Sequence, residues 1–262
     1  ATAVYVTADS GNETALRSAL TNWGYTLNPA VGAKQINQLT GSDLSGYDVL
    51  IMKSTAEIDW SYNAANPPTY KSVAALAIEN FLNNGGGVLT SGWTVYYNTS
   101  HGDPADFVPA TGMGYSWGNV AAYYGGGQHL RFVQETADST LNDLLYSDFE
   151  ADIAGYSYSV NYFTARSGAT VFYRTPDLTP AYFLNGSENN QAVVIGWDFN
   201  GAGTGGRVLS YSSFLDKKEL DADFNQLIYN MVRWVDPIPE PNVLALVLFC
   251  AAGLIRYGRR VL

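Results

Sequence analysis

The chain has 262 residues and a formal net charge of −10 at pH 7, from 24 acidic and 14 basic side chains. Three of the basic residues, Arg256, Arg259 and Arg260, lie at its very end, so residues 1–255 carry 11 basic against 24 acidic side chains, a balance of 11 − 24, or −13. This acidity repels phosphate backbones and excludes nucleic acid as an expected partner. The single cysteine, Cys250, excludes disulfides and thiol catalysis from the chain before it.

The first 91 residues alternate between short apolar runs and helical patterns. The predicted strands cover residues 4–8, 47–53 and 88–91, and the predicted helices cover 16–23 and 73–82. The first helix follows a capping-box pattern, and the second ends at a run of three glycines. This alternation is typical of a parallel sheet that is covered by helices on both faces.

The pattern changes after this point. Residues 92–128 are rich in glycine and aromatic residues and show no sustained period, which predicts a long excursion from the core. Further on, the chain indicates mainly strands, at 130–134, 170–174, 181–184, 192–197 and 207–211. A final amphipathic helix over 224–235 is predicted to pack on the sheet and end the domain.

Five segments carry a more specific signal. They are Tyr-Asp-Val-Leu-Ile at 47–51, Phe-Leu-Asn-Asn-Gly-Gly-Gly-Val-Leu at 81–89, Val-Ile-Gly at 194–196, Gly-Gly-Arg-Val-Leu at 205–209 and Asn-Met-Val-Arg-Trp at 230–234. Together they resemble the class I glutamine amidotransferase-like fold, especially its ThuA-like branch. The resemblance implies one α/β, flavodoxin-like domain of three layers over residues 1–235, with a mostly parallel sheet.

The same resemblance argues against the activity of that family. Its catalytic cysteine follows a strand on a sharp turn, where this chain has Thr90-Ser91-Gly92-Trp93 and no cysteine. ThuA-like members often place a histidine just after the glycine-rich strand, and this too is missing. The fold is therefore expected without the catalytic triad, without a cofactor and without a metal.

A serine hydrolase is the first catalytic alternative. Ser91 would be the nucleophile, with His101 or His129 as the base and Asp103 or Asp198 as the acid that orients it. The Gly-x-Ser-x-Gly pattern of a nucleophile elbow is not met, because a leucine stands at the first glycine position. The structural alternative is that Ser91 caps the end of a strand and His101 lies on a polar loop.

Acidic side chains offer other chemistry, but no pair stands out by its spacing. Candidate pairs for glycoside hydrolysis are more simply interpreted as solvated surface charges: Glu57 with Asp59, Asp148 with Glu150, and Asp221 with Asp223. The run Asp221-x-Asp223-x-Asn225 begins like a calcium loop but lacks the glycine and the glutamate that such a loop needs. No metal site is predicted.

The strongest candidate for binding is the aromatic part of the excursion, residues 93–124. It leaves from the carboxyl end of a predicted parallel strand, where ligands of open α/β sheets collect. Aromatic rings suit stacking on sugar rings, so an extracellular polysaccharide is a candidate ligand. The alternatives are a second core under a long loop and a protein–protein contact. The candidate residues are Trp93, Tyr96, Tyr97, Tyr115, Trp117, Tyr123 and Tyr124.

The last 27 residues are a unit of their own. Residues 236–242 form a proline-rich spacer that contains Pro239, Glu240 and Pro241, and residues 243–262 form an apolar run with a basic end at Arg256, Arg259 and Arg260. As a helix, the run 243–255 measures roughly 20 Å, short of the roughly 30 Å hydrocarbon core of a bilayer. The arginines favour a cytoplasmic end and a domain outside the cytoplasm.

This three-part tail resembles the PEP-CTERM sorting signal of exported Gram-negative bacterial proteins. The resemblance implies an exosortase-type processing enzyme as a partner and an inner-membrane-anchored precursor held through the C-terminal helix. Export also needs a signal peptide, and the small residues at the N-terminus suit a product of signal peptidase. The processed protein is then expected at the outer surface or in the extracellular matrix.

The sequence thus predicts a non-catalytic structural protein of the cell surface or of a biofilm matrix associated with exopolysaccharide, with self-association through its Tyr- and Gly-rich surface. The first alternative is a polysaccharide-binding module that uses the aromatic segment 93–124. The second is a hydrolase centred on Ser91 or on a pair of carboxylates. Three measurements distinguish these classes. Retardation on polysaccharides tests binding, labelling by a fluorophosphonate probe tests an active serine, and concentration-dependent assembly tests the structural role.

Overall fold

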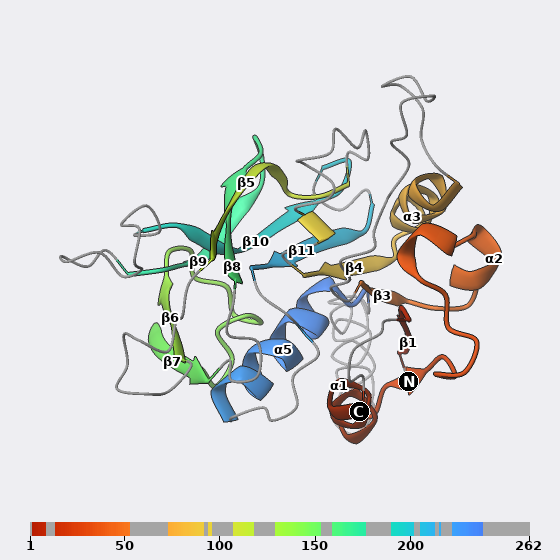
Figure 1. The fold of residues 1–262 in the computed structure, drawn as a ribbon, viewed down its shortest axis with the longest axis horizontal. Helices are drawn as coiled ribbons and strands as arrows, with labels where there is room; N and C mark the ends of the chain where they lie inside the picture. The colour runs from red at the N-terminus through yellow and green to blue at the C-terminus, as the bar shows by residue number, and fades with distance from the viewer. Residues whose placement is uncertain are drawn as a thin grey trace, which may run out of the picture.

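The computed structural model describes residues 2–8, 14–52, 73–91, 94–95, 107–117, 129–152, 159–176, 190–201, 205–212, 215 and 222–237. In these residues the chain builds one twisted sheet with helices against it (Figure 1). The main strand order is β2-β1-β3-β4-β11-β10-β9-β6-β7, and β5 joins through β8, which pairs with β10. The chain therefore has an α/β fold with a mixed sheet.

One half of the sheet is parallel. Its strands are β2 (Thr26–Leu27), β1 (Ala3–Val6), β3 (Val49–Met52), β4 (Gly87–Thr90) and β11 (Arg207–Tyr211). Helix α1 (Thr14–Asn22) connects β1 to β2, and α3 (Val73–Asn83) lies between β3 and β4 in the chain. A helical crossover returns the chain to the same edge of the sheet, so the strands that it connects run parallel.

The other half is antiparallel, which corrects the expectation of a mostly parallel sheet. It contains β10 (Ala192–Asp198), β9 (Thr170–Arg174), β6 (His129–Gln134), β7 (Asp148–Asp152) and β8 (Ser159–Ala165) with β5 (Ala110–Trp117). For β10 and β11 the physical reason is the length of the connection. Residues 199–206 join these two antiparallel strands, and they are fewer than the dozen or so residues of a crossover.

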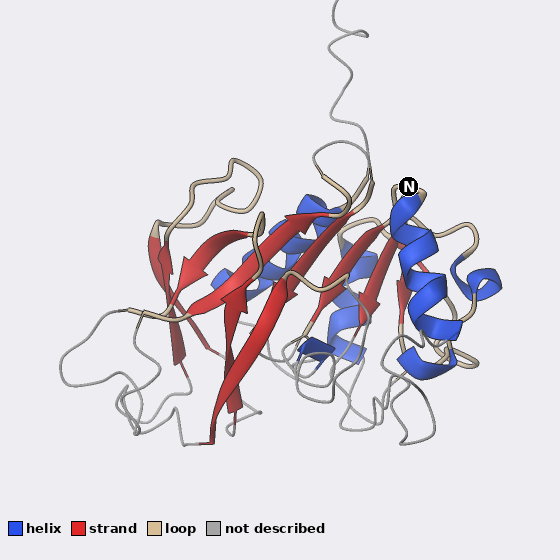
Figure 2. Ribbon diagram, turned by 90° about the horizontal axis from the view of Figure 1, so that it is seen from above, coloured by secondary structure: helices blue, strands red, loops and turns tan. Residues whose placement is uncertain are grey.

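Two hydrophobic clusters lie on the two faces of the sheet and make the layers. Helices α1 and α5 (Ala222–Val235) cover one face, and α3, the 3-10 helix η1 (Ile36–Gln38) and α2 (Gly41–Leu44) cover the other. Successive residues of one strand supply the two clusters, as Leu89 and Val88 of β4 do. Figure 2 shows the antiparallel strands extending sideways beyond the helices. The three-layer prediction is confirmed for the parallel half.

Most predicted elements are present. The helices at 16–23, 73–82 and 224–235 correspond to α1, α3 and α5, and the strands that start the chain correspond to β1, β3 and β4. The predicted excursion is not wholly irregular, because residues 110–117 form β5 within it. Strands β7 and β8 were not predicted, and the strand predicted at 181–184 lies outside the described residues.

The run of three glycines after α3 has a packing reason. Gly85 ends the helix with a φ of +89°, a left-handed conformation that suits glycine. A Cβ at Gly87 would lie 1.8 Å from the carbonyl oxygen of Val235 at the end of α5, and a Cβ at Gly206 would lie 1.7 Å from the carbonyl oxygen of Gly86. Backbones of α3, β4, β11 and α5 therefore meet here without intervening side chains.

Gly206→Ala is expected to lower the free energy of unfolding by at least about 3 kcal/mol, since the new methyl group must displace backbone rather than a flexible side chain. Gly41→Ala is the matched control, because a Cβ at Gly41 meets no atom within 4 Å and the backbone there is not left-handed. Urea denaturation of both variants measures the difference. Equal midpoints would contradict the close packing described here.

Candidate functional site

The carboxyl ends of the parallel strands carry the first candidate site, with Ser91 directly after β4. Ser91 is fully buried. Its carbonyl oxygen accepts a hydrogen bond from the N–H of Val95 at 3.4 Å, and its hydroxyl lies 3.4 Å from the hydroxyl of Thr94. Val95 and Thr94 are helical. Ser91 thus follows the end of β4 directly and bonds to the two helical residues described after it.

Other hydroxyl groups lie at the same edge. The hydroxyls of Thr90 and Ser210 are 2.6 Å apart across β4 and β11, and the hydroxyl of Thr7 donates to the carbonyl of Ile51 at 3.4 Å. The buried hydroxyl of Ser212 has no hydrogen-bond partner among the described residues. All four hydroxyls are buried. This edge is a polar layer inside the protein rather than an open groove in the described part.

The structure does not bring the described members of the serine-hydrolase constellation together. Asp198 pairs with Arg207 at the start of β11, whereas Thr90 pairs with Ser210 further along the same strand. Arg207 and Ser210 are three residues apart, so Asp198 lies about 10 Å along the sheet from Thr90, the residue before Ser91. Its carboxylate lies 3.3 Å from the Arg207 Nε. His129 begins β6, which is four strand positions from β4, about 19 Å at ~4.8 Å per strand. His101 and Asp103 lie outside the described residues.

The candidate residues of the aromatic segment are placed in part. Tyr115 and Trp117 lie on β5, opposite Asn161 and Ser159 of β8. Before them, Phe107, Val108 and Ala110 are buried in the same cluster as α3. This part of the excursion thus belongs to the main core on that face of the sheet. Outside the described residues lie Trp93, Tyr96, Tyr97, Tyr123 and Tyr124.

A cavity of about 650 Å³ opens at the opposite, amino edge of the parallel strands. Its walls are the turn after α2, with Tyr47 and Asp48, the last turns of α3 and the glycines after them, and Pro237. The Tyr47 ring packs edge-to-face on Tyr5, with centroids 5.2 Å apart. Asp48, the charged side chain of the lining, accepts a hydrogen bond from the N–H of Ala3 at 2.8 Å. We call this the amino-edge cavity.

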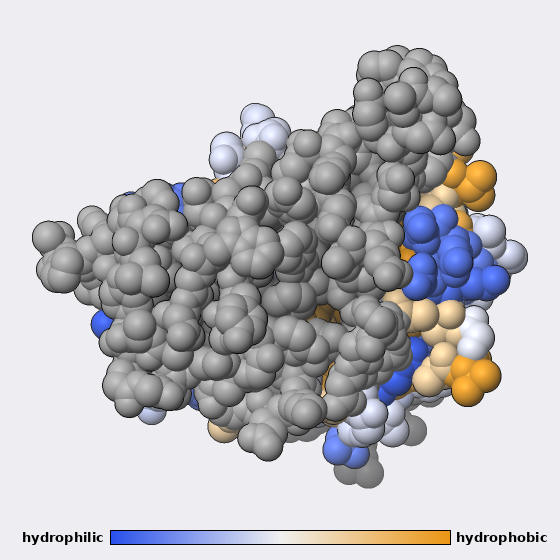
Figure 3. All heavy atoms as spheres, in the orientation of Figure 1, coloured by the Kyte–Doolittle hydropathy of each residue, from blue (hydrophilic) through white to orange (hydrophobic). Residues whose placement is uncertain are grey.

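The surface around this cavity is of mixed character. In Figure 3 the described surface over α2 and α3, at the right, combines hydrophilic residues with small hydrophobic patches. Exposed apolar side chains there include Val73 and Leu76 of α3. No basic side chain lines the cavity among its described residues, so an anionic ligand would gain no ion pair in it.

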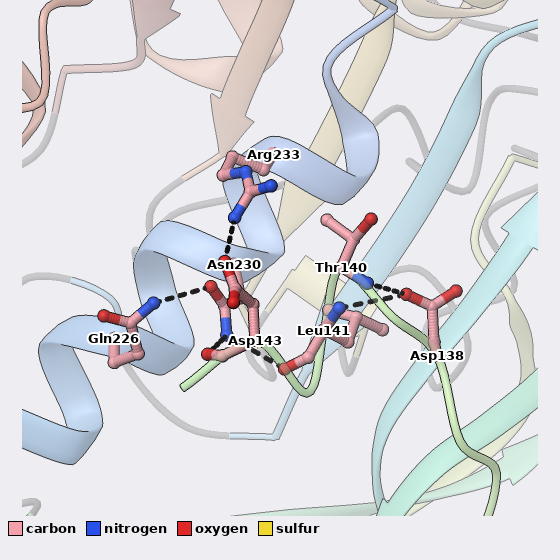
Figure 4. Close-up of polar contacts among 7 residues, drawn as sticks. All are labelled: Asp138, Thr140, Leu141, Asp143, Gln226, Asn230 and Arg233. Carbon is pink, nitrogen blue, oxygen red and sulfur yellow. Dashed lines mark hydrogen bonds and ion pairs between the residues drawn. The ribbon is translucent and has the colours of Figure 1, made fainter. Parts of the chain in front are cut away.

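A third place is the loop of residues 135–147 between β6 and β7, which a buried network fixes to α5 (Figure 4). Asn230, fully buried in α5, donates to the carbonyl of Leu141 at 3.0 Å and to that of Asp143 at 2.7 Å. Arg233 donates to the Asp143 carboxylate at 2.6 Å. The carboxylate of Asp138 accepts from the N–H groups of Thr140 and Leu141, each at 2.9 Å, and closes the turn.

The other side of the loop is held by Tyr173 of β9. The Asn142 side chain donates to the Tyr173 hydroxyl at 2.5 Å. Burial raises the pKa of Tyr173 to about 12, although the hydrogen bond from Asn142 opposes part of the rise. The phenol is therefore neutral at any physiological pH. Sequence reasoning missed this network, but one signal for it was available, since Asn230 interrupts the apolar stripe of the last helix.

The fixed loop displays two apolar side chains to solvent. Leu144 is 82% exposed and has a φ of +58°, and Tyr146 is 80% exposed. A left-handed backbone costs a leucine about 1–2 kcal/mol, so the surrounding contacts must hold it there. We call these two residues the Leu144 tip.

Two further searches of the described residues concern metals and membranes. No group of three His, Cys, Asp or Glu side chains lies together there so that it would hold a metal ion. Within the same residues, none of the helices has both the length and the apolar character to cross a membrane. The apolar run 243–255 lies outside the described residues.

Comparison with known proteins shows the fold alone. No family profile and no curated protein matches the sequence. A ThuA-like protein from Bacteroides uniformis superimposes with a TM-score of 0.60 at 14% identity, over 89% of this chain and 90% of its own. A ThuA-like protein from Parabacteroides merdae gives 0.53 at 11% identity, over 90% and 89%.

The fold also occurs within a larger chain. A β-galactosidase from Bacillus circulans superimposes with a TM-score of 0.51 at 14% identity, over 92% of this chain but 32% of the enzyme. These neighbours show an α/β fold that resembles the ThuA-like, class I glutamine amidotransferase-like structures, which confirms the fold resemblance. Identities this low carry no activity from them to this chain.

Leu144→Gly is expected to raise the free energy of unfolding by about 0.5–1 kcal/mol. Glycine removes the strain of the left-handed backbone, and the extra conformational entropy that glycine loses on folding offsets only part of this gain. Tyr146→Gly is the control in the same loop. The φ of Tyr146 is not positive, so glycine there loses conformational entropy on folding and relieves no backbone strain. Denaturant titration measures both. A loss of stability in Leu144→Gly would contradict the assigned strain.

Proposed function

We propose that this chain is a non-catalytic, exported protein of the cell surface or extracellular matrix. The observation that carries the non-catalytic part is Ser91. It lies near the place where the class I amidotransferase-like resemblance puts a catalytic cysteine, yet its side chain is fully buried, with its hydroxyl 3.4 Å from that of Thr94. A nucleophile must reach its substrate, and burial behind a strand end opposes that.

The exported location rests on the tail. The folded domain ends just before the tail. Helix α5 ends at Val235, and the carboxylate of Asp236 accepts a hydrogen bond from the hydroxyl of Thr2 at 2.9 Å. Pro237 follows at once and cannot continue the helix. This boundary supports a tail that functions apart from the domain, as a PEP-CTERM-type signal for an exosortase-type enzyme requires. The precursor would be held in the inner membrane through residues 243–262.

A structural role in a matrix requires a contact between copies or with other matrix components. The Leu144 tip supports such a contact, because it exposes a leucine and a tyrosine on a loop that is already ordered. Little conformational entropy is then lost on association, which favours binding by a small patch. Aromatic residues of this kind are enriched at the centres of protein interfaces.

A polysaccharide-binding module is the second candidate. Its support is the position of Tyr115 and Trp117 at the end of β5, on the strand pair β5–β8 that joins the sheet at β10. A regular strand holds neighbouring aromatic residues at fixed spacing, which suits repeating sugar units. Retardation of the domain on bacterial polysaccharides, with Trp117→Ala as the variant, separates this candidate from the first.

The intact mass of the protein recovered from its native surface tests the export proposal. We expect a chain that ends near Pro241 and lacks the apolar run, because exosortase-type processing removes the sequence after the Pro-Glu-Pro motif. A Pro239→Ala, Pro241→Ala chain is expected to keep its full C-terminus and stay with the inner membrane. A wild-type chain that extends to Leu262 at the outer surface would refute processing.

Sedimentation velocity at rising concentration tests self-association through the Leu144 tip. The wild-type chain is expected to form larger species, and the pair of changes Leu144→Gly and Tyr146→Ser is expected to shift the midpoint of assembly at least about tenfold, or ~1.4 kcal/mol. Val31→Ser is the matched control, since Val31 is 94% exposed but lies far along the chain from this loop. Unchanged assembly of the double variant would remove the tip from the contact.

A further inference from the structure

The amino-edge cavity lies beside the C-terminal boundary of the domain, where the proline-rich spacer begins. Pro237 is the last described residue and itself lines the cavity. The end of α5 just before it is fixed, because the carbonyl of Val235 packs on Gly87 and the N–H of Asp236 donates to the carbonyl of Val232 at 2.9 Å. The chain therefore enters its proline-rich spacer from a fixed point on the rim of a cavity.

The lining has the chemistry of a site for an extended, proline-rich segment. Tyr47 contributes a partly buried aromatic ring, and the buried side chains of Phe81 and Leu44 add the little apolar surface that they leave accessible. Asn80 on α3 and Asn84 just after it are exposed, and their amide groups can donate to backbone carbonyls. Aromatic grooves with a few such donors are the general sites for proline-rich segments, whose prolines fix the extended form before binding.

The size of the cavity agrees with this occupant. Residues 238–241 are Ile-Pro-Glu-Pro and reach about 12 Å in the extended form at ~3.1 Å per residue. The cavity of about 650 Å³ is of the size that commonly holds a ligand of this kind. The described lining offers no cation, and Asp48 is already engaged by the N–H of Ala3. The uncharged residues Ile238, Pro239 and Pro241 therefore suit the cavity, and the carboxylate of Glu240 must stay in solvent.

We propose that the amino-edge cavity is the docking site for residues 238–241 of the same chain. The segment is tethered at the rim by Pro237, so its effective concentration at the cavity is high and weak contacts suffice to hold it. Docking covers the start of the Pro-Glu-Pro motif, so the segment must leave the cavity before it can be cut there. The docking contact itself does not depend on cleavage. The order of release and cutting does, and it rests on the proposed function.

Disulfide trapping in the full-length chain tests the contact. In a Cys250→Ser background, Asn84→Cys is combined with Pro239→Cys, and Val31→Cys with Pro239→Cys is the control at an exposed site outside the cavity lining. Linking requires Cα atoms roughly 4.4–6.8 Å apart. We expect the cavity pair to link at least about tenfold faster than the control pair, the ratio that ~1.4 kcal/mol of docking gives.

A filled cavity provides the second measurement. Asn80→Trp places a large side chain at an exposed lining position of α3, so the fold is kept while the space is lost. The Asn84→Cys and Pro239→Cys pair is then expected to link as slowly as the control. Equal linking of the cavity and control pairs in the unfilled chain would overturn the proposal, and so would fast linking that the tryptophan does not slow.

The outcomes separate this proposal from the proposed function. Fast linking at the cavity together with an uncut chain at the cell surface would keep the docking site and refute processing. A chain cut near Pro241 without preferential linking would keep processing and refute the docking site.

Discussion

The contact on which the arrangement depends is the direct packing of backbones at Gly86, Gly87 and Gly206. Here the end of α3, the starts of β4 and β11 and the end of α5 approach so closely that no Cβ fits between them. The N–H of Gly206 donates to the carbonyl of Leu82 at 2.7 Å, so the junction is hydrogen-bonded as well as packed. Both helical layers are thereby fixed to the centre of the sheet at one point.

The two edges of the parallel half differ in how open they are. At the amino edge, the cavity lies beside α2 and α3. At the carboxyl edge, hydroxyl groups of Thr7, Thr90, Ser91 and Ser210 are buried instead. The usual site of the fold is thus closed in the described part, while an unusual site is open on the opposite side. Pro237, the last described residue, lines this open site, so the chain leaves the domain beside it.

Much of the fold could be predicted because the parallel strands are buried on both faces and so appear as continuous apolar runs, such as Val49–Met52. Strand β7, with Asp-Phe-Glu-Ala-Asp, is an edge strand and was missed because its pattern is mainly polar. Helix α2 has too few residues for a period, although Thr40 and Asp43 form a capping box there. The position of Ser91 was predictable, but its burial depends on packing. The amino-edge cavity joins segments far apart in the sequence, so no local pattern predicts it.

Strand β7 has a consequence for how copies of this protein can meet. It ends the main strand order, and acids stand at alternate positions, Asp148, Glu150 and Asp152. Strand β7 of a second copy, added antiparallel to this one, would bring like charges opposite one another, which is destabilising. The other end of the order is β2, with only two residues. Continuous hydrogen-bonded pairing is therefore disfavoured at both ends of the main order, which leaves β5 as the longer edge among the described strands. Copies that meet at β7 or β2 would do so through side chains, in contacts that dilution reverses.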